Sequence, residues 1–132
     1  MLGIASLGHA INTYHYDNFS WALRQSIFKR IDEYGWKLAG ARDGRLPNSF
    51  YFCIPDKNAE EIMIRLDIYH DIQVSTGSAC SSGSKKPSSA LKAIGVPEGD
   101  LFSYIRVSFH GDEDPSDVLA VFDTIKEVAD AL

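Results

Sequence analysis

Residues 75–84 read STGSACSSGS, a run of small residues with one cysteine, Cys80, near its middle. Side chains of this size bury almost no apolar area, and Ser and Gly favour turns over helix interiors. The stretch therefore predicts an exposed loop that carries a thiol group, and we expect residues 76–86 to be the least ordered internal segment. By itself, a Gly/Ser pattern is more often a flexible linker in which a cysteine has no role.

Four blocks of sequence, taken in order, resemble the cysteine desulfurases of the class V aminotransferase family. RLPNS at residues 45–49 resembles the family's entry to a strand, and the cysteine stretch at residues 75–84 resembles its active-site loop. PSSAL at residues 87–91 resembles the helix after that loop, and YIRVS at residues 104–108 resembles the substrate-binding strand. The long loop is similar to that of the first, NifS/IscS-like group. The resemblance is good over residues 45–108 and implies the C-terminal small domain of such an enzyme, without its large domain.

The resemblance also implies two site residues. In the family, a loop cysteine attacks the sulfur of cofactor-bound L-cysteine, keeps it as a persulfide and releases alanine; Cys80 is the matching position. Arg106 matches the arginine that holds the substrate carboxylate, for which a planar guanidinium offers two parallel hydrogen bonds. A thiol with a pKa of about 8.5 is mostly protonated at neutral pH, so the chemistry needs a nearby cation or base. Lys85 and Lys86 are candidates, although solvated loop lysines are the plainer interpretation.

The cofactor of this family is pyridoxal phosphate, which the large domain holds through a lysine in a Ser-x-His-Lys context. None of the four histidines of this chain precedes a lysine: His9, His15, His70 and His110. We therefore expect the chain alone to bind no pyridoxal phosphate and to be inactive alone. The resemblance implies as partners a large-domain chain that carries the cofactor, L-cysteine as substrate, and a sulfur-acceptor or scaffold protein of iron–sulfur cluster assembly.

Three functions remain open on the sequence. The chain can be one half of a cysteine desulfurase that supplies Cys80 and Arg106 to a large domain. It can be a persulfide carrier that needs no cofactor, in which Cys80 accepts sulfur from another protein. It can also be a binding module that keeps the fold without any chemistry.

The composition of the 132 residues, with 45% hydrophobic and 23% charged residues, is that of one globular domain. A net charge of -5 argues against general nucleic-acid binding. There is neither a membrane-span-length apolar stretch nor a signal peptide, so we expect no membrane association and a cytoplasmic location. Two cysteines and histidines without ligand spacing argue against a metal site. Cys53 lies in a strand pattern and is most simply a small structural residue.

Hydrophobic spacing predicts one α+β domain, a small and mostly antiparallel sheet covered by helices. The resemblance implies the same fold, that of the C-terminal domain of fold-type I pyridoxal-phosphate enzymes. Residues 17–132 would form this small domain. Residues 1–16 would be the remnant of the linker from the large domain, and residues 1–11 would form a short helix within it. Helices are expected at residues 18–34, 58–66, 87–95 and from 115 to the end, and strands at 36–41, 49–54, 72–75 and 104–109. Asn58 with Glu61 resembles a capping box at the start of the second helix, and Asp114 followed by Pro115 indicates the start of the last one. In the last strand, Ile105, Val107 and Phe109 should face the core, and Arg106 should point away from it.

Overall fold

The structure is a computed structural model that describes residues 20–77 and 86–132. Three sequence predictions lie outside the described residues: the short helix at residues 1–11, the linker at residues 1–16 and the position of Cys80. The same holds for most of the segment that we expected to be least ordered.

Four antiparallel strands form one sheet in the order β1-β2-β4-β3. Their bounds are β1 (Lys37–Leu38), β2 (Ser49–Cys53), β3 (Ser75–Thr76) and β4 (Tyr104–Ser108). The two long strands lie in the centre and the two short ones at the edges. In the register of this sheet, Arg106 of β4 lies opposite Tyr51 on one side and opposite Ser75 on the other.

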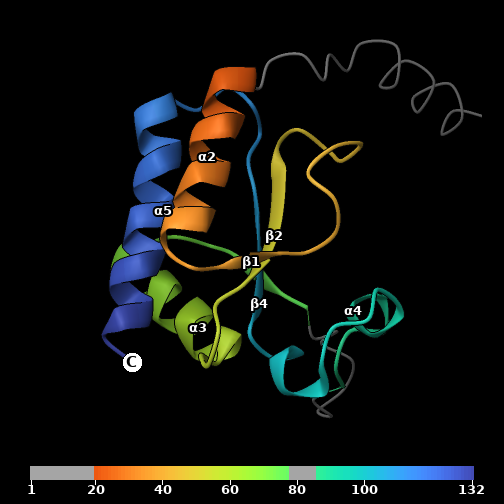
Figure 1. The fold of residues 1–132 in the computed structure, drawn as a ribbon. Coiled ribbons are helices and arrows are strands. Elements are labelled where there is room, and N and C mark those ends of the chain that lie inside the picture. Colours follow the sequence, from red (N-terminus) through yellow and green to blue (C-terminus); the bar gives the residue numbers. More distant parts are fainter. Residues whose placement is uncertain (1–19, 78–85) are drawn as a thin grey trace, which may run out of the picture.

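Three long helices cover one face of the sheet, and a short helix lies on the other side (Figure 1). The long ones are α2 (Trp21–Glu33), α3 (Ala59–His70) and α5 (Pro115–Asp130), and the short one is α4 (Ser89–Ala93), which the 3-10 turn η2 (Glu98–Asp100) follows. Helix α5 contacts both α2 and α3. This is the α+β architecture that the sequence predicted.

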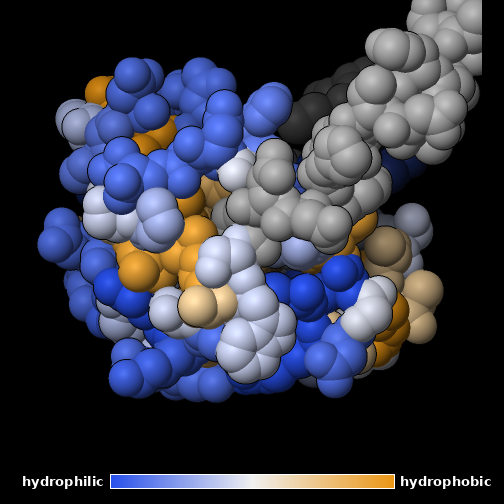
Figure 2. Space-filling view, turned by 90° about the horizontal axis from the view of Figure 1, so that it is seen from above, coloured by the Kyte–Doolittle hydropathy of each residue, from blue (hydrophilic) through white to orange (hydrophobic). Residues whose placement is uncertain are grey.

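The main core lies between the sheet and the three long helices. The alternation of β2 and β4 turns Phe50, Phe52 and Ile105 into it, and all three are fully buried. Helices α2 and α5 fill it from the other side with their apolar stripes: Leu23, Ile27, Phe28 and Ile31, and Val118, Phe122, Ile125, Val128 and Ala129. The described surface seen from above is mainly hydrophilic, with smaller apolar patches between polar side chains (Figure 2).

A second, smaller apolar cluster lies on the opposite face of the sheet, against α4. Its buried members are Cys53, Leu91, Leu101 and Tyr104, and the partly buried Tyr51 packs against them. Burial raises the pKa of the Cys53 thiol to about 11. Cys53 is therefore protonated at neutral pH, which favours the structural role that its strand position suggested.

Helix α3 is one turn longer than its apolar pattern predicted. It continues past Leu66 to His70 and ends where Asp71 adopts a left-handed conformation with φ of 54°. The additional turn exposes Ile68 and Tyr69 to solvent, so it carries no burial signal in the sequence. An Asp can supply the left-handed C-cap that Gly usually supplies, and the sequence gives little sign of this.

The predicted capping box at the start of α3 forms only in part. The Asn58 Oδ1 atom accepts hydrogen bonds from the backbone N–H groups of Glu60 and Glu61, at 2.9 and 3.4 Å. The Glu61 carboxylate, however, accepts a hydrogen bond from Arg65 one turn later. Asn58 is thus the N-cap, as predicted, and Glu61 forms an i,i+4 ion pair.

The two edge strands are shorter than predicted. Strand β1 pairs only through Lys37 and Leu38, and the strand expected at residues 72–75 pairs only from Ser75 to Thr76. Ile72 and Val74 instead pack against the main core without joining the sheet. Their apolar character reflected this packing, which a strand pattern alone cannot distinguish from pairing.

Candidate functional site

Arg106 lies on the outer face of the sheet, the face turned away from the three long helices. Its neighbours Ile105 and Val107 point into the main core, so the two-residue period of β4 turns Arg106 the other way and leaves it exposed. Its Nε atom donates a hydrogen bond to Ser75 Oγ at 3.1 Å. The Ser75 hydroxyl in turn lies 3.5 Å from the Arg106 carbonyl oxygen, to which it donates.

A polar patch surrounds the arginine on this face. We call it the outer patch and define it as Ser49, Tyr51, Ser75, Arg106 and Ser108, which the sheet register places on adjacent strands. The Ser49 and Ser108 hydroxyl groups are 3.1 Å apart. Within residues 20–77 and 86–132, the Arg106 side chain makes one hydrogen bond, and its Nε atom is the donor. Its two Nη groups can therefore bind an oxyanion in the paired geometry of a guanidinium.

Cys80 lies outside the described residues, but both sides of its stretch are described. Strand β3 leads into it, and Gly77 is the last described residue before it. After it, Ser88 is the N-cap of α4, and its Oγ atom accepts a hydrogen bond from the Leu91 backbone N–H at 3.3 Å. The structure thus brings the strand before the cysteine next to the strand that carries Arg106.

Tyr51 is a residue of this site that the sequence did not reveal. The alternation of β2 put it on the outer face, but only the register shows that it lies opposite Arg106. Its ring packs edge-on against Tyr104, with centroids 5.4 Å apart. Burial raises the pKa of the Tyr51 hydroxyl, and a hydrogen bond from Ser88 and the charge of Arg106 oppose this shift. Tyr51 therefore remains protonated at neutral pH.

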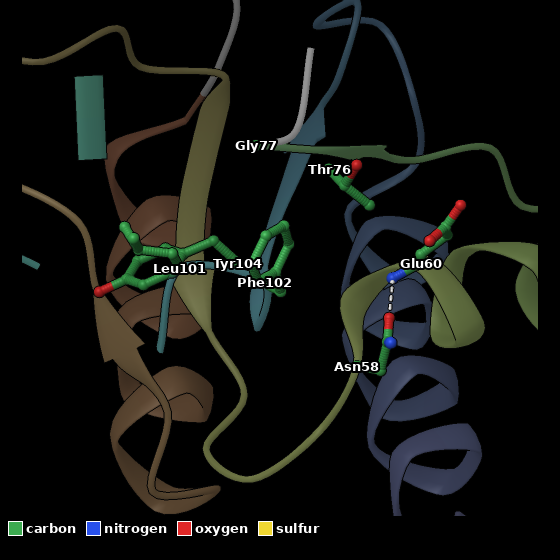
Figure 3. Close-up of a pocket in the computed structure, with 7 residues that line it drawn as sticks. All are labelled: Asn58, Glu60, Thr76, Gly77, Leu101, Phe102 and Tyr104. Atoms are coloured by element: carbon green, nitrogen blue, oxygen red, sulfur yellow. Dashed lines mark hydrogen bonds between the residues drawn. The ribbon is translucent and has the colours of Figure 1, made fainter. Parts of the chain in front are cut away.

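A cavity of about 230 Å³ opens beside the end of β3 (Figure 3). Asn58 and Glu60 line it from the start of α3, and the other lining residues are Thr76, Gly77, Leu101, Phe102 and Tyr104. A second cavity, of about 270 Å³, lies beside α3 and is lined by Met63, Ile64, Asp67, Gln73 and Val74. Among the described residues, no lysine lines either cavity.

A metal centre would need several His, Cys, Asp or Glu side chains close together in residues 20–77 and 86–132. No group of three His, Cys, Asp or Glu side chains in these ranges is arranged so that it could hold a metal ion. None of the helices described there combines the length and the apolar character that crossing a bilayer requires.

The fold matches that of a known class of domain. The X-ray structure of a NifS-like protein from Rickettsia africae superposes with a TM-score of 0.66 and 26% sequence identity. The match covers 89% of this chain and 30% of that one. The described residues therefore form an α+β domain of the NifS-like kind.

Curated sequences lead to the same family. Cysteine desulfurase IscS of Clostridium botulinum is 31% identical over 137 residues, which cover 96% of this chain. Cysteine desulfurase IscS of Dictyoglomus turgidum is 44% identical over 73 residues, or 55% of this chain. The chain belongs with the IscS/NifS-like cysteine desulfurases. It spans 34% and 18% of the length of these two relatives. No protein-family profile matches it.

Proposed function

We propose that the chain acts as the small domain of a cysteine desulfurase. Cys80 supplies the thiol that accepts sulfur from L-cysteine, and Arg106 holds the substrate carboxylate. The observation that carries this proposal is the hydrogen bond between Arg106 and Ser75, the first residue of the strand that leads to Cys80. Three peptide units separate Gly77 from Cys80, so their Cα atoms are at most about 11 Å apart.

The size of the substrate supports this assignment. L-Cysteine carries its carboxylate and its sulfur on neighbouring carbon atoms. The residue that holds the carboxylate must therefore lie close to the residue that attacks the sulfur. The pairing of β3 with β4 supports this assignment, because it puts Ser75, five residues before Cys80 in the sequence, next to Arg106. Held through two hydrogen bonds, the substrate would also have a defined orientation toward the thiol.

The proposed conversion balances without an added oxidant or reductant. The Cys80 sulfur bonds to the substrate sulfur, the carbon–sulfur bond of the substrate breaks, and the products are alanine and a persulfide on Cys80. Pyridoxal phosphate, carried by a large domain, would supply the electron sink for breaking that bond. The persulfide would then pass its outer sulfur to an acceptor or scaffold protein.

A chimera tests the proposal. This chain replaces the matched segment of Clostridium botulinum IscS, so that the remaining part of that enzyme supplies the large domain. We expect the chimera to form alanine and sulfide from L-cysteine in the presence of a thiol reductant. Cys80→Ser should abolish both products while the absorbance of the bound cofactor is retained. A chimera that carries its cofactor but forms neither product would contradict the proposal.

A further inference from the structure

The Tyr51 hydroxyl group lies directly against Gly77. A Cβ atom built on Gly77 would be 1.9 Å from the Tyr51 Oη atom and 3.1 Å from Leu91 Cδ1. Both distances are too short for ordinary contact, and the first is far too short. The phenol group therefore occupies the space that any larger side chain at position 77 would need.

The same hydroxyl group also reaches the far side of the cysteine stretch. The Ser88 side chain lies near it and lowers its pKa, and Leu91 of α4 lies close to Gly77, as the Tyr51 hydroxyl group does. Ser88 in turn is the N-cap of α4, whose Leu91 is fully buried in the second cluster. One phenol oxygen thus meets Gly77, before residues 78–85, and Ser88, after them. A hydroxyl group can donate and accept at once, so it suits a contact between two segments.

Tyr51 is itself held firmly in place. It lies in the middle of β2, a central strand, where its backbone neighbours Phe50 and Phe52 are fully buried. Its ring packs edge-on against the buried Tyr104. A tyrosine has few rotatable bonds, so a fixed ring also fixes its hydroxyl group. Arg106 lies directly opposite Tyr51 in the sheet.

We propose that Tyr51 is a positioning residue. Through its hydroxyl group it holds Gly77 and Ser88 together on the sheet beside Arg106, and so sets where the segment that carries Cys80 leaves and rejoins the domain. The effect of Tyr51 on sulfur transfer rests on the function proposed above. The contact of Tyr51 with Gly77 and Ser88 does not rest on that function, so the contact and its effect on sulfur transfer can be tested separately.

Hydrogen exchange of this chain tests the contact. Tyr51→Phe removes only the oxygen and keeps the ring packing. We expect backbone exchange to become about three- to tenfold faster both at residues 75–77 and at residues 88–91, with exchange in α5 unchanged. Tyr34→Phe is the matched control, because it removes a phenol oxygen that bonds to Asp123 between α2 and α5. Faster exchange at only one of the two segments, at neither, or equally in the control would overturn the proposal.

Kinetics of the chimera test the functional part. Tyr51→Phe should lower kcat about three- to tenfold and leave the KM for L-cysteine unchanged, because Arg106 still holds the substrate. A purely structural role would leave kcat per folded molecule unchanged, and that result would overturn the positioning role. An inactive parent chimera would contradict the proposed function, and the exchange experiment would still decide whether Tyr51 links the two segments.

Discussion

Arg106 and Ser75 lie opposite each other on β4 and β3, and the Arg106 Nε atom donates to the Ser75 hydroxyl at 3.1 Å. The two residues are far apart in the sequence, and the sheet makes them neighbours. This pair connects the expected carboxylate-binding residue with the strand that leads to the expected nucleophile. Among the described residues, the two Nη groups of Arg106 make no side-chain hydrogen bond, so they can bind an oxyanion.

Arg106→Lys should reduce cysteine use far more than it affects folding. A lysine keeps the charge but loses the paired hydrogen bonds, at about 1.5–3 kcal/mol for a hydrogen bond to a charged group. In the chimera, kcat/KM for L-cysteine should therefore fall about ten- to a hundredfold. The side chain is exposed, so its replacement leaves no cavity and the thermal midpoint should hardly change. An early-melting variant whose activity follows its folded fraction would make Arg106 a packing residue.

Gly77→Ala should destabilise the domain, and Tyr51→Phe should relieve part of the loss. The backbone at Gly77 lies outside the positive-φ region, so an alanine there is limited by space alone. We expect a loss of about 1–3 kcal/mol in the free energy of unfolding for the single variant, from urea denaturation. The loss should be smaller when the Tyr51 oxygen is absent. Strictly additive effects would mean that the two groups do not meet.

Cys53 should not react with thiol reagents in the folded domain. It is fully buried, and its pKa of about 11 keeps the thiol protonated. An aromatic disulfide reagent at about pH 8 should find no fast-reacting thiol in Cys80→Ser until urea unfolds it. The wild-type chain should show one fast thiol, and Cys53→Ser should keep it. A fast thiol in folded Cys80→Ser would show that Cys53 is accessible.

Asp123→Asn should cost stability at neutral pH but not in acid. The Asp123 carboxylate accepts from Arg30 Nε at 2.7 Å and from the Tyr34 hydroxyl at 2.6 Å, and the Arg30 bond in particular holds its pKa below the ordinary 3.8. A carboxyl group whose pKa is lower in the folded than in the unfolded state stabilises the fold at pH values above its unfolded-state pKa. This contribution is lost as the pH falls through its folded-state pKa.

The size of this effect is modest because the Asp123 side chain is 44% exposed and solvent screens the pair. We expect wild type to exceed Asp123→Asn by about 0.5–1.5 kcal/mol in free energy of unfolding at neutral pH. The difference should shrink as the pH falls below about 4. A difference that is the same at both ends of this range would show that the charge of Asp123 does not contribute.

The parts of the fold that the sequence predicted are those that a local period determines. The burial of Phe50, Phe52 and Ile105, and the outward position of Arg106, follow from the two-residue period of a strand packed on one side. The long helices followed in the same way from their apolar stripes. Local chemistry also located the N-caps Asn58 and Asp114.

The parts that it did not predict depend on distant residues. The role of Tyr51 requires the register of β2 against β4 and the approach of Gly77 and Ser88, which no short pattern contains. The end of α3 depends on the left-handed conformation of Asp71, which few Asp residues adopt. Strand β3 is short because only two residues reach β4, and its sequence does not differ from that of an ordinary loop.

Transfer of labelled sulfur tests the central claim most directly. The chimera is incubated with L-cysteine that carries radioactive sulfur, without reductant, and the labelled peptide is identified after alkylation and digestion. We predict one labelled sulfur atom on Cys80, none on Cys53, and loss of the label when reductant is added. Alanine should form in equal amount. Label on Cys53, or alanine formation with no labelled sulfur on Cys80, would contradict the assignment of Cys80 as the sulfur acceptor.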